Sequence, residues 1–147
     1  MTWHAQLKLH YRSSGCQTHL QFEHQGPLRV MQSLYPEGSE ICHTVLVHPP
    51  GGLVGGDVID VQAQLDPGAH ALVTTPGATR FYRSEAGQAT QQVHARLQDG
   101  ARLEWLPLEA LAYSGCLARN MARFELAPTA ELLTWDITAL GLPLAQQ

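Results

Sequence analysis

Apolar and polar residues alternate along most of this chain with a period of two. In residues 5–11, Ala5, Leu7, Leu9 and Tyr11 alternate with polar side chains. Successive side chains of a β-strand point to opposite faces, so this pattern predicts a strand with one buried face. A short helix is predicted only over residues 107–112, where a proline suits the first helical position. Further strands are predicted over residues 59–65, 93–97, 102–105, 123–126 and 133–137.

Three turns of similar composition divide these strands into units. Each turn ends in an alanine, and Ala69, Ala101 and Ala130 are 32 and 29 residues apart. Asp-Pro-Gly and Asp-Gly precede the first two alanines, and both are strong turn sequences. We interpret each unit as a hairpin that buries its apolar face by stacking on the next. The fold class predicted is all-β, a solenoid-like or superhelical stack of strand–turn–strand repeats; three unrelated hairpins with generic turns are the alternative.

The third unit runs nearly to Gln147 and has no polar capping element after it. Stacked repeats need such caps, because an open sheet edge invites aggregation. We therefore expect residues 1–147 to form a single β-rich domain that is part of a longer chain, or whose end a partner covers.

Composition narrows the class of protein. The 147 residues are 44% hydrophobic and 15% charged, with a net charge of −4 and a single lysine, Lys8. This disfavours both general disorder and nucleic-acid binding. No apolar run approaches the length of a membrane span, and the N-terminal residues do not resemble a signal peptide. Three widely spaced cysteines suit a reducing compartment, so we expect a cytoplasmic protein.

A glycine-rich segment, His48 to Asp57, is the least ordinary part of the sequence. It lacks the Gly-Lys-Ser/Thr of a phosphate-binding loop and the spacing of a dinucleotide fingerprint. Structurally, its glycine pairs allow tight reversal or close approach of another backbone, and Asp57 can bond loop amides. Functionally, the same glycines with one carboxylate suit close docking of a partner or passage of a small cation. Both interpretations stay open.

A second loop covers residues 74–83 and pairs a Pro-Gly turn with arginines and aromatic residues. Arg80 and Arg83 could clamp carboxylates of a partner, and Phe81 and Tyr82 could anchor an interface. An ordinary hairpin corner with a solvated basic rim is the alternative.

Local sequence patterns give little support for a metal site or a catalytic site. There are eight histidines but no CxxC, HxxxH or HExxH pattern. A standalone metal-binding module that uses Asp57 and some histidines stays an alternative. So does a hydrolase in which two carboxylates, such as Glu104 and Asp136, meet in space. No catalytic residue is assigned, and we expect a binding scaffold that is not an enzyme.

Four ordered motifs together resemble the UreD (UreH) family of urease accessory proteins. They span nearly the whole chain, and the combination is far more specific than any one motif. The motifs are Gly26-Pro27-Leu28-Arg29-Val30 with Leu34-Tyr35-Pro36-Glu37-Gly38, Cys42-His43 leading to His48 through Asp57, Thr74 through Ser84, and Leu103 through Glu109.

The resemblance implies a non-catalytic, elongated β-scaffold of the cytoplasm. It implies action with the accessory protein UreF and the GTPase UreG on apo-urease, as a chaperone of nickel insertion. Nickel contact would be transient, with no stably bound cofactor. Family members run to nearly twice this length, so the chain would be the N-terminal half. The resemblance suggests these residues for partner binding or a nickel path: His48, Gly51, Gly52, Gly55, Gly56, Asp57, Thr75, Pro76, Gly77, Arg80 and Tyr82.

Overall fold

The strands form three sheets in this computed structural model, which describes residues 2–85 and 87–140. The described residues contain thirteen strands and no helix. The first sheet has the order β11 (Ala118–Leu126), β8 (Ala89–Leu97), β5 (Val58–Leu65), β1 (His4–Ser14), β2 (Gln17–Gln25). The second has the order β12 (Glu131–Thr134), β9 (Arg102–Leu106), β6 (His70–Thr74), β4 (Ile41–Val47), β3 (Arg29–Val30). The small third sheet has the order β13 (Thr138–Leu140), β10 (Ala110–Ala112), β7 (Thr79–Phe81).

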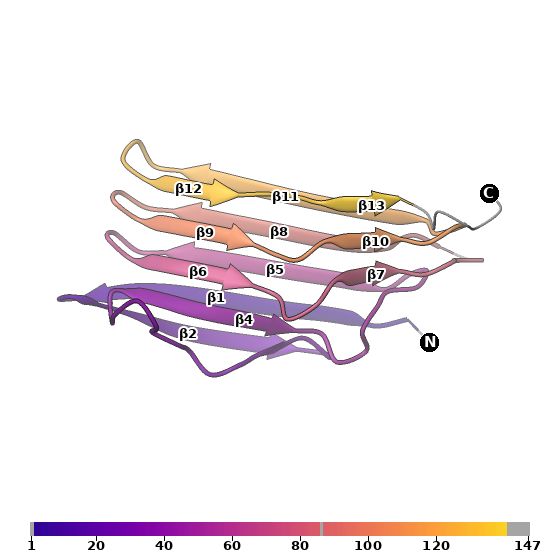
Figure 1. The fold of residues 1–147 in the computed structure, drawn as a ribbon, viewed down its shortest axis with the longest axis horizontal. Helices are drawn as coiled ribbons and strands as arrows, with labels where there is room; N and C mark the ends of the chain where they lie inside the picture. Colours follow the sequence, from indigo (N-terminus) through magenta and orange to yellow (C-terminus); the bar gives the residue numbers. More distant parts are fainter. Residues whose placement is uncertain (1, 86, 141–147) are drawn as a thin grey trace.

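Successive units stack as coils of a β-solenoid (Figure 1). Each coil contributes one strand to each sheet: β5, β6 and β7, then β8, β9 and β10, then β11, β12 and β13. Equivalent strands of neighbouring coils pair in parallel, and the register aligns Leu65 with Leu97 and Leu97 with Leu126. The predicted all-β, solenoid-like stack is confirmed.

The predicted hairpins are wrong, although the repeat itself is present. β5 pairs with β1 and β8, and β6 pairs with β4 and β9, so the two strands of a unit lie in different sheets. The turn carries the chain from one sheet to the other. Alternation shows which face of a strand is buried but not which strand is its neighbour, and Asp-Pro-Gly can make either reversal.

The three repeated turns share one geometry and lie one above another along one side of the stack, at the left in Figure 1. In each turn the alanine amide donates to the carbonyl three residues earlier, at 3.0 Å. Ala69 and Ala101 are fully buried. The turns also bond to one another, since the Gly68 amide donates to the Asp99 carbonyl at 3.1 Å. Hydrogen bonds thus join neighbouring turns along this side of the stack, and the links between coils lie on the opposite side (Figure 1).

The predicted helix over residues 107–112 is wrong. Ala110–Ala112 form β10, which pairs in parallel with β7 on one side and β13 on the other. The helical preference of so short a segment is weak, and two rows of inter-strand hydrogen bonds outweigh it.

The core lies between the inner faces of the sheets. Leu7, Leu9 and Tyr11 of β1 are almost completely buried, and the Tyr11 hydroxyl donates to Thr44 Oγ1 at 2.7 Å. Burial raises the pKa of Tyr11, so the phenol stays protonated.

The third coil differs from the prediction in the face it buries. The register places Leu132 and Thr134 beside the inward Leu103 and Trp105, so Leu133 lies on the outer side. Leu133, Trp135 and Ile137 are about half exposed (55%, 46% and 53%), although alternation predicted them to be buried. No described strand pairs with the free edge of this coil.

Candidate functional site

The glycine-rich segment forms the link between β4 and β5. Two tight turns shape it: the Gly51 amide donates to the His48 carbonyl at 2.9 Å, and the Asp57 amide to the Val54 carbonyl at 3.0 Å. Gly51 and Gly56 have φ angles of 76° and 86°, in the left-handed region that side chains disfavour. The tight reversal predicted from these glycines is thus present.

Hydrogen bonds join this link directly to the second loop. The Leu53 amide donates to the Arg80 carbonyl at 2.7 Å, and the Tyr82 amide donates to the Leu53 carbonyl at 2.9 Å. Leu53 therefore forms a parallel bridge with Phe81 and continues the small third sheet beyond β7. The two loops, predicted separately, form one surface.

Gly52 lies beneath the ring of Tyr82. A Cβ atom at position 52 would lie 2.3 Å from Tyr82 Cε2 and 3.0 Å from the Arg80 carbonyl oxygen. Glycine is therefore required for this close approach. The Tyr82 ring in turn stacks on Tyr113, with centroids 5.4 Å apart and planes 24° apart.

This aromatic pair is accessible. Tyr82 is 38% exposed, whereas its neighbour Phe81 is 2% exposed and belongs to the core. Of the two aromatic anchors considered from the sequence, only Tyr82 can contact a partner. Arg80 and Arg83 are exposed beside it, and the Arg83 stem covers Gly115, whose Cβ would lie 3.1 Å from Arg83 Cγ. We call Tyr82, Tyr113, Arg80 and Arg83 the tyrosine surface.

Thr75, Pro76 and Gly77 form the corner between β6 and β7. The Thr75 hydroxyl donates to the Gly77 carbonyl and accepts from the Leu108 amide, both at 3.0 Å. Thr75 thus attaches this corner to the next coil, while Pro76 and Gly77 are exposed.

Asp57 faces into its own loop. Its Oδ1 accepts from the Trp3 amide at 3.3 Å and its Oδ2 from the Val54 amide at 3.0 Å, and the residue is 3% exposed. Both carboxylate oxygens thus satisfy backbone donors, as the structural interpretation of this residue expects. Gly55 and Gly56 lie against Gly87, whose Cβ would approach the Gly56 nitrogen to 3.2 Å.

His48 is partly buried against Trp3, with ring centroids 4.7 Å apart. Its Nε2 atom is buried and has no hydrogen-bond partner among the described residues. Burial lowers the pKa of His48, and the nearby negative charge of Asp57 only partly opposes this shift.

The lowered pKa of His48 makes the stability of the folded chain depend on pH. His48 binds its proton less readily in the folded chain, so we expect stability to be complete above pH about 6.5 and to fall as the pH drops below it. On acidification, the melting temperature of the parent chain should therefore fall relative to that of His48→Gln, whose side chain does not titrate. Melting temperatures of the two chains that change in parallel from pH about 8 to 5.5 would contradict this expectation.

The alternatives that rest on metal or carboxylate clusters gain no support. Among residues 2–85 and 87–140, no three His, Cys, Asp or Glu side chains come together as metal ligands. Glu104 contacts His70 at 2.9 Å, and Asp136 accepts from Asn120 at 3.4 Å. The two carboxylates considered as a hydrolytic pair thus have different partners.

One family of known proteins matches almost the whole chain. The family described as UreD urease accessory protein matches residues 4–147. The chain belongs to the UreD family. It is 63% identical over 147 residues to the urease accessory protein UreD of Paracidovorax citrulli (strain AAC00-1), covering 100% of this chain and 53% of that protein.

Two further relatives have similar identity to this chain and a similar share of their length covered. The urease accessory protein UreD of Polaromonas sp. (strain JS666 / ATCC BAA-500) is 62% identical over 145 residues, covering 99% of this chain and 52% of that protein. That of Leptothrix cholodnii (strain ATCC 51168 / LMG 8142 / SP-6) is 60% identical over 147 residues, covering 99% and 53%. This UreD-family chain thus spans about half the length of the curated relatives it matches. The described residues contain no helix that could span a membrane.

Two contributors to the site escaped the sequence analysis. Trp3 donates to Asp57 and packs on His48, and Tyr113 stacks on Tyr82. The 32-residue spacing from Ala69 to Ala101 would align Tyr82 with Ser114, and only the register of the structure, which aligns Ala112 with Phe81, brings Tyr113 to Tyr82. No sequence signal pointed to Trp3.

Proposed function

We propose that this UreD-family chain acts as a non-catalytic scaffold in urease maturation. In this proposal it joins UreF and UreG on apo-urease in the cytoplasm and assists nickel insertion. Nickel would be cargo in transient contact with the scaffold, not a resident cofactor. The family match over residues 4–147 carries the proposal.

The tyrosine surface supports a role in partner binding. Exposed tyrosines and arginines are the side chains that contribute most often to binding hot spots. Gly52 and Tyr113 hold the Tyr82 ring from two sides, so little conformational entropy would be lost on docking. A pre-ordered aromatic pair flanked by Arg80 and Arg83 suits a partner surface that offers an apolar pocket with carboxylates at its rim.

The proposal is tested by co-purifying a tagged protein that carries this chain with UreF, UreG and apo-urease. Tyr82→Ala is expected to reduce recovery of the complex about tenfold, the effect of losing one binding hot spot. Urease nickel content and activity, measured in the same cells, should fall with it.

Met31→Ala provides the matched control. Met31 is 55% exposed and lies outside both loops, so its variant should retain the complex. If the parent protein recovers none of the three partners, the proposed function is wrong. If it recovers them and Tyr82→Ala does so equally well, the function stands but the tyrosine surface is not the interface.

A further inference from the structure

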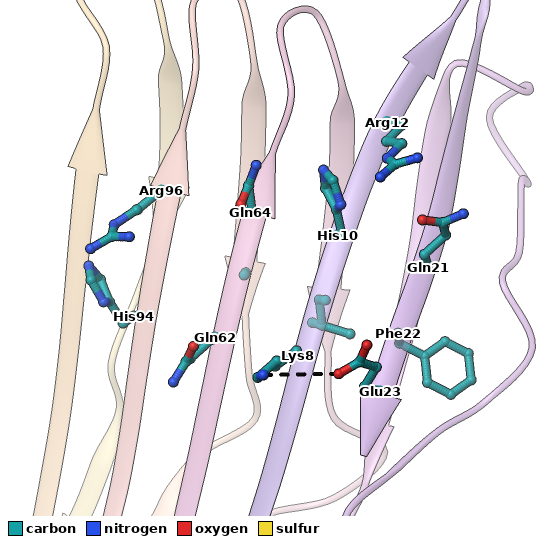
Figure 2. Close-up of a pocket in the computed structure, with 12 residues that line it drawn as sticks. Lys8, His10, Arg12, Gln21, Phe22, Glu23, Gln62, Gln64, His94 and Arg96 are labelled. Atoms are coloured by element: carbon teal, nitrogen blue, oxygen red, sulfur yellow. Dashed lines mark ion pairs between the residues drawn. The ribbon is translucent and has the colours of Figure 1, made fainter.

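One edge of β2 has no partner strand among the described residues, because β2 ends the first sheet and pairs only with β1. This free edge borders the polar pocket on the outer face of the sheet (Figure 2). An edge strand presents a row of unpaired backbone N–H and C=O groups, which can bond to the backbone of another chain. β2 shares no residue with the tyrosine surface or with the two loops that form it. Its free edge is therefore a separate candidate for binding.

Alternate residues of β2 direct their backbone groups toward this edge. The Tyr11 carbonyl accepts from the Asp66 amide at the end of β5, so odd-numbered residues of β1 bond to β5 and even-numbered ones to β2. The register places His10 opposite Gln21, so odd-numbered residues of β2 bond to β1. The residues whose backbone groups point to the free edge are therefore Thr18, Leu20, Phe22 and His24.

The start of this edge is occupied, and the remainder is open. The Thr18 amide donates to the Ser39 carbonyl at 3.0 Å, and the Tyr35 hydroxyl donates to the Thr18 carbonyl at 2.8 Å. From Leu20 onward, no backbone group in the described part of the chain bonds to the outward N–H and C=O groups of β2. Residues 21–25 are all exposed, so another strand can approach them.

The open part of β2 lacks the features that usually protect a sheet edge, which are a short strand, lysine, proline or a bulge. β2 is nine residues long and contains no lysine or proline, and its register with β1 is unbroken from Gln17 to Gln25. By contrast, β3 at the corresponding edge of the second sheet has only two residues.

An aromatic side chain lies at the middle of the open edge. Phe22 is 46% exposed, and Figure 2 shows its ring on the side of β2 away from β1. The His24 ring stacks on it, with centroids 6.4 Å apart and planes 22° apart. The Phe22 ring is thus already ordered where an added strand would lie, which lowers the entropy lost on pairing.

The open edge is complementary to itself in one antiparallel register. When Phe22 lies opposite Phe22 of a second copy, Leu20 lies opposite His24 of that copy, and every open position exchanges backbone hydrogen bonds. The two Phe22 rings then meet at the twofold axis as an aromatic pair. On the outer face Gln21 lies opposite Glu23 of the second copy, where its amide can donate to the carboxylate.

Neighbouring registers fit less well. With Gln21 at the axis, His24 would lie opposite Thr18 of the second copy, whose backbone groups are already bonded to Ser39 and Tyr35. With Glu23 at the axis, the two Glu23 carboxylates would lie directly opposite each other, which is destabilising. The register with Phe22 at the axis is therefore the one that uses the whole open edge.

We propose that β2 is a dimerisation strand, through which two copies of this chain pair antiparallel about a twofold axis at Phe22. The first sheets of the two copies then form one continuous sheet, and the closed pair leaves no β2 edge for a third copy. One pair of strands buries less area than a standard interface, so we expect a dissociation constant in the micromolar range. The proposal depends neither on the tyrosine surface nor on the proposed function.

Sedimentation equilibrium of the chain, followed across the micromolar concentration range, tests this proposal. The parent should change from monomer to dimer, whereas Phe22→Pro should stay monomeric. Proline at this position removes an N–H group that points to the free edge and keeps the hydrogen bonds to β1. Circular dichroism and melting curves verify that the variant folds. A parent that is monomeric at every concentration would overturn the proposal and leave the edge to a strand of another protein.

Ala122→Pro is the matched control, at the opposite edge of the same sheet. The Ala127 amide donates to the Leu97 carbonyl of β8, so odd-numbered residues of β11 bond to β8 and the Ala122 N–H points to the free edge. Ala122 is also exposed, and its variant should dimerise as the parent does. A monomeric Ala122→Pro beside a dimeric Phe22→Pro would overturn the proposal, because the copies would then associate through β11.

Two substitutions of the exposed Gln21 test the register, and neither removes a backbone group. Gln21→Lys places a cation opposite Glu23 of the second copy and should strengthen the dimer about three- to tenfold. Gln21→Glu places like charges there and should weaken the dimer by a similar factor. Weakening by both substitutions would show that Gln21 lies opposite itself and would overturn the register with Phe22 at the axis. Unchanged dimerisation in both would overturn pairing through β2.

Discussion

Replacing Leu65 with alanine is expected to lower the free energy of unfolding by about 2–5 kcal/mol. Leu65 ends β5 and is 0% exposed, so its side chain lies wholly between the sheets. Truncation removes buried apolar contacts and leaves a cavity that neighbouring coils can fill only in part. Urea unfolding followed by circular dichroism measures the loss.

The repeat supplies a matched control for this substitution. Leu126 occupies the equivalent position of the third coil, aligned through Leu97, but it is 44% exposed. Leu126→Ala should therefore cost about 1 kcal/mol or less. Equal losses at Leu65 and Leu126 would show that the third coil is as well covered in solution as the first.

Gly52→Ala is expected to destabilise the chain by about 1–3 kcal/mol, the usual range for forcing an extra carbon into a packed site. The new methyl group would meet the Tyr82 ring at 2.3 Å and the Arg80 carbonyl oxygen at 3.0 Å. The ring can move away, but only by giving up its stacking on Tyr113. Thermal unfolding measures the loss in stability.

Two comparisons identify the cause. Gly77→Ala should be close to neutral, because no atom lies within 4 Å of its added Cβ and its φ angle is not positive. Adding Tyr82→Ala to Gly52→Ala should cost less than the sum of the two single losses, since the closest clash disappears while that with Arg80 remains. Additive losses in the double variant would rule out the ring contact as the cause.

The repeat shows how far local patterns can be used. Alternation correctly predicted that Leu7, Leu9 and Tyr11 face a core, and the turn sequences correctly predicted equivalent roles for Ala69 and Ala101. Both signals depend only on the pleat of a strand and on turn chemistry. The sequence also predicted the two loops of the candidate site, because Gly-Gly pairs and Thr-Pro-Gly are unusual in any strand.

The same patterns failed where a neighbouring strand decides the outcome. Residues 107–112 have a weak helical preference, but pairing on both sides makes Ala110–Ala112 a strand. Leu133 is part of an apolar alternation, yet alignment of Leu132 with Leu103 turns Leu133 outward. Local sequence patterns do not specify which residues of neighbouring strands pair. A shift of one residue in that pairing exchanges the buried and the exposed face of the strand.

Sequence alone thus determined the class of fold, the period of its repeat and the loops that interrupt it, because these follow from side-chain alternation and turn chemistry. Only the tertiary structure decided that each unit crosses between two sheets instead of closing a hairpin. It also brought Gly52, Tyr82 and Tyr113 together from separate parts of the chain. These contacts follow from parallel stacking of coils about thirty residues apart, where register and packing between distant strands, not local preference, determine which side chains meet.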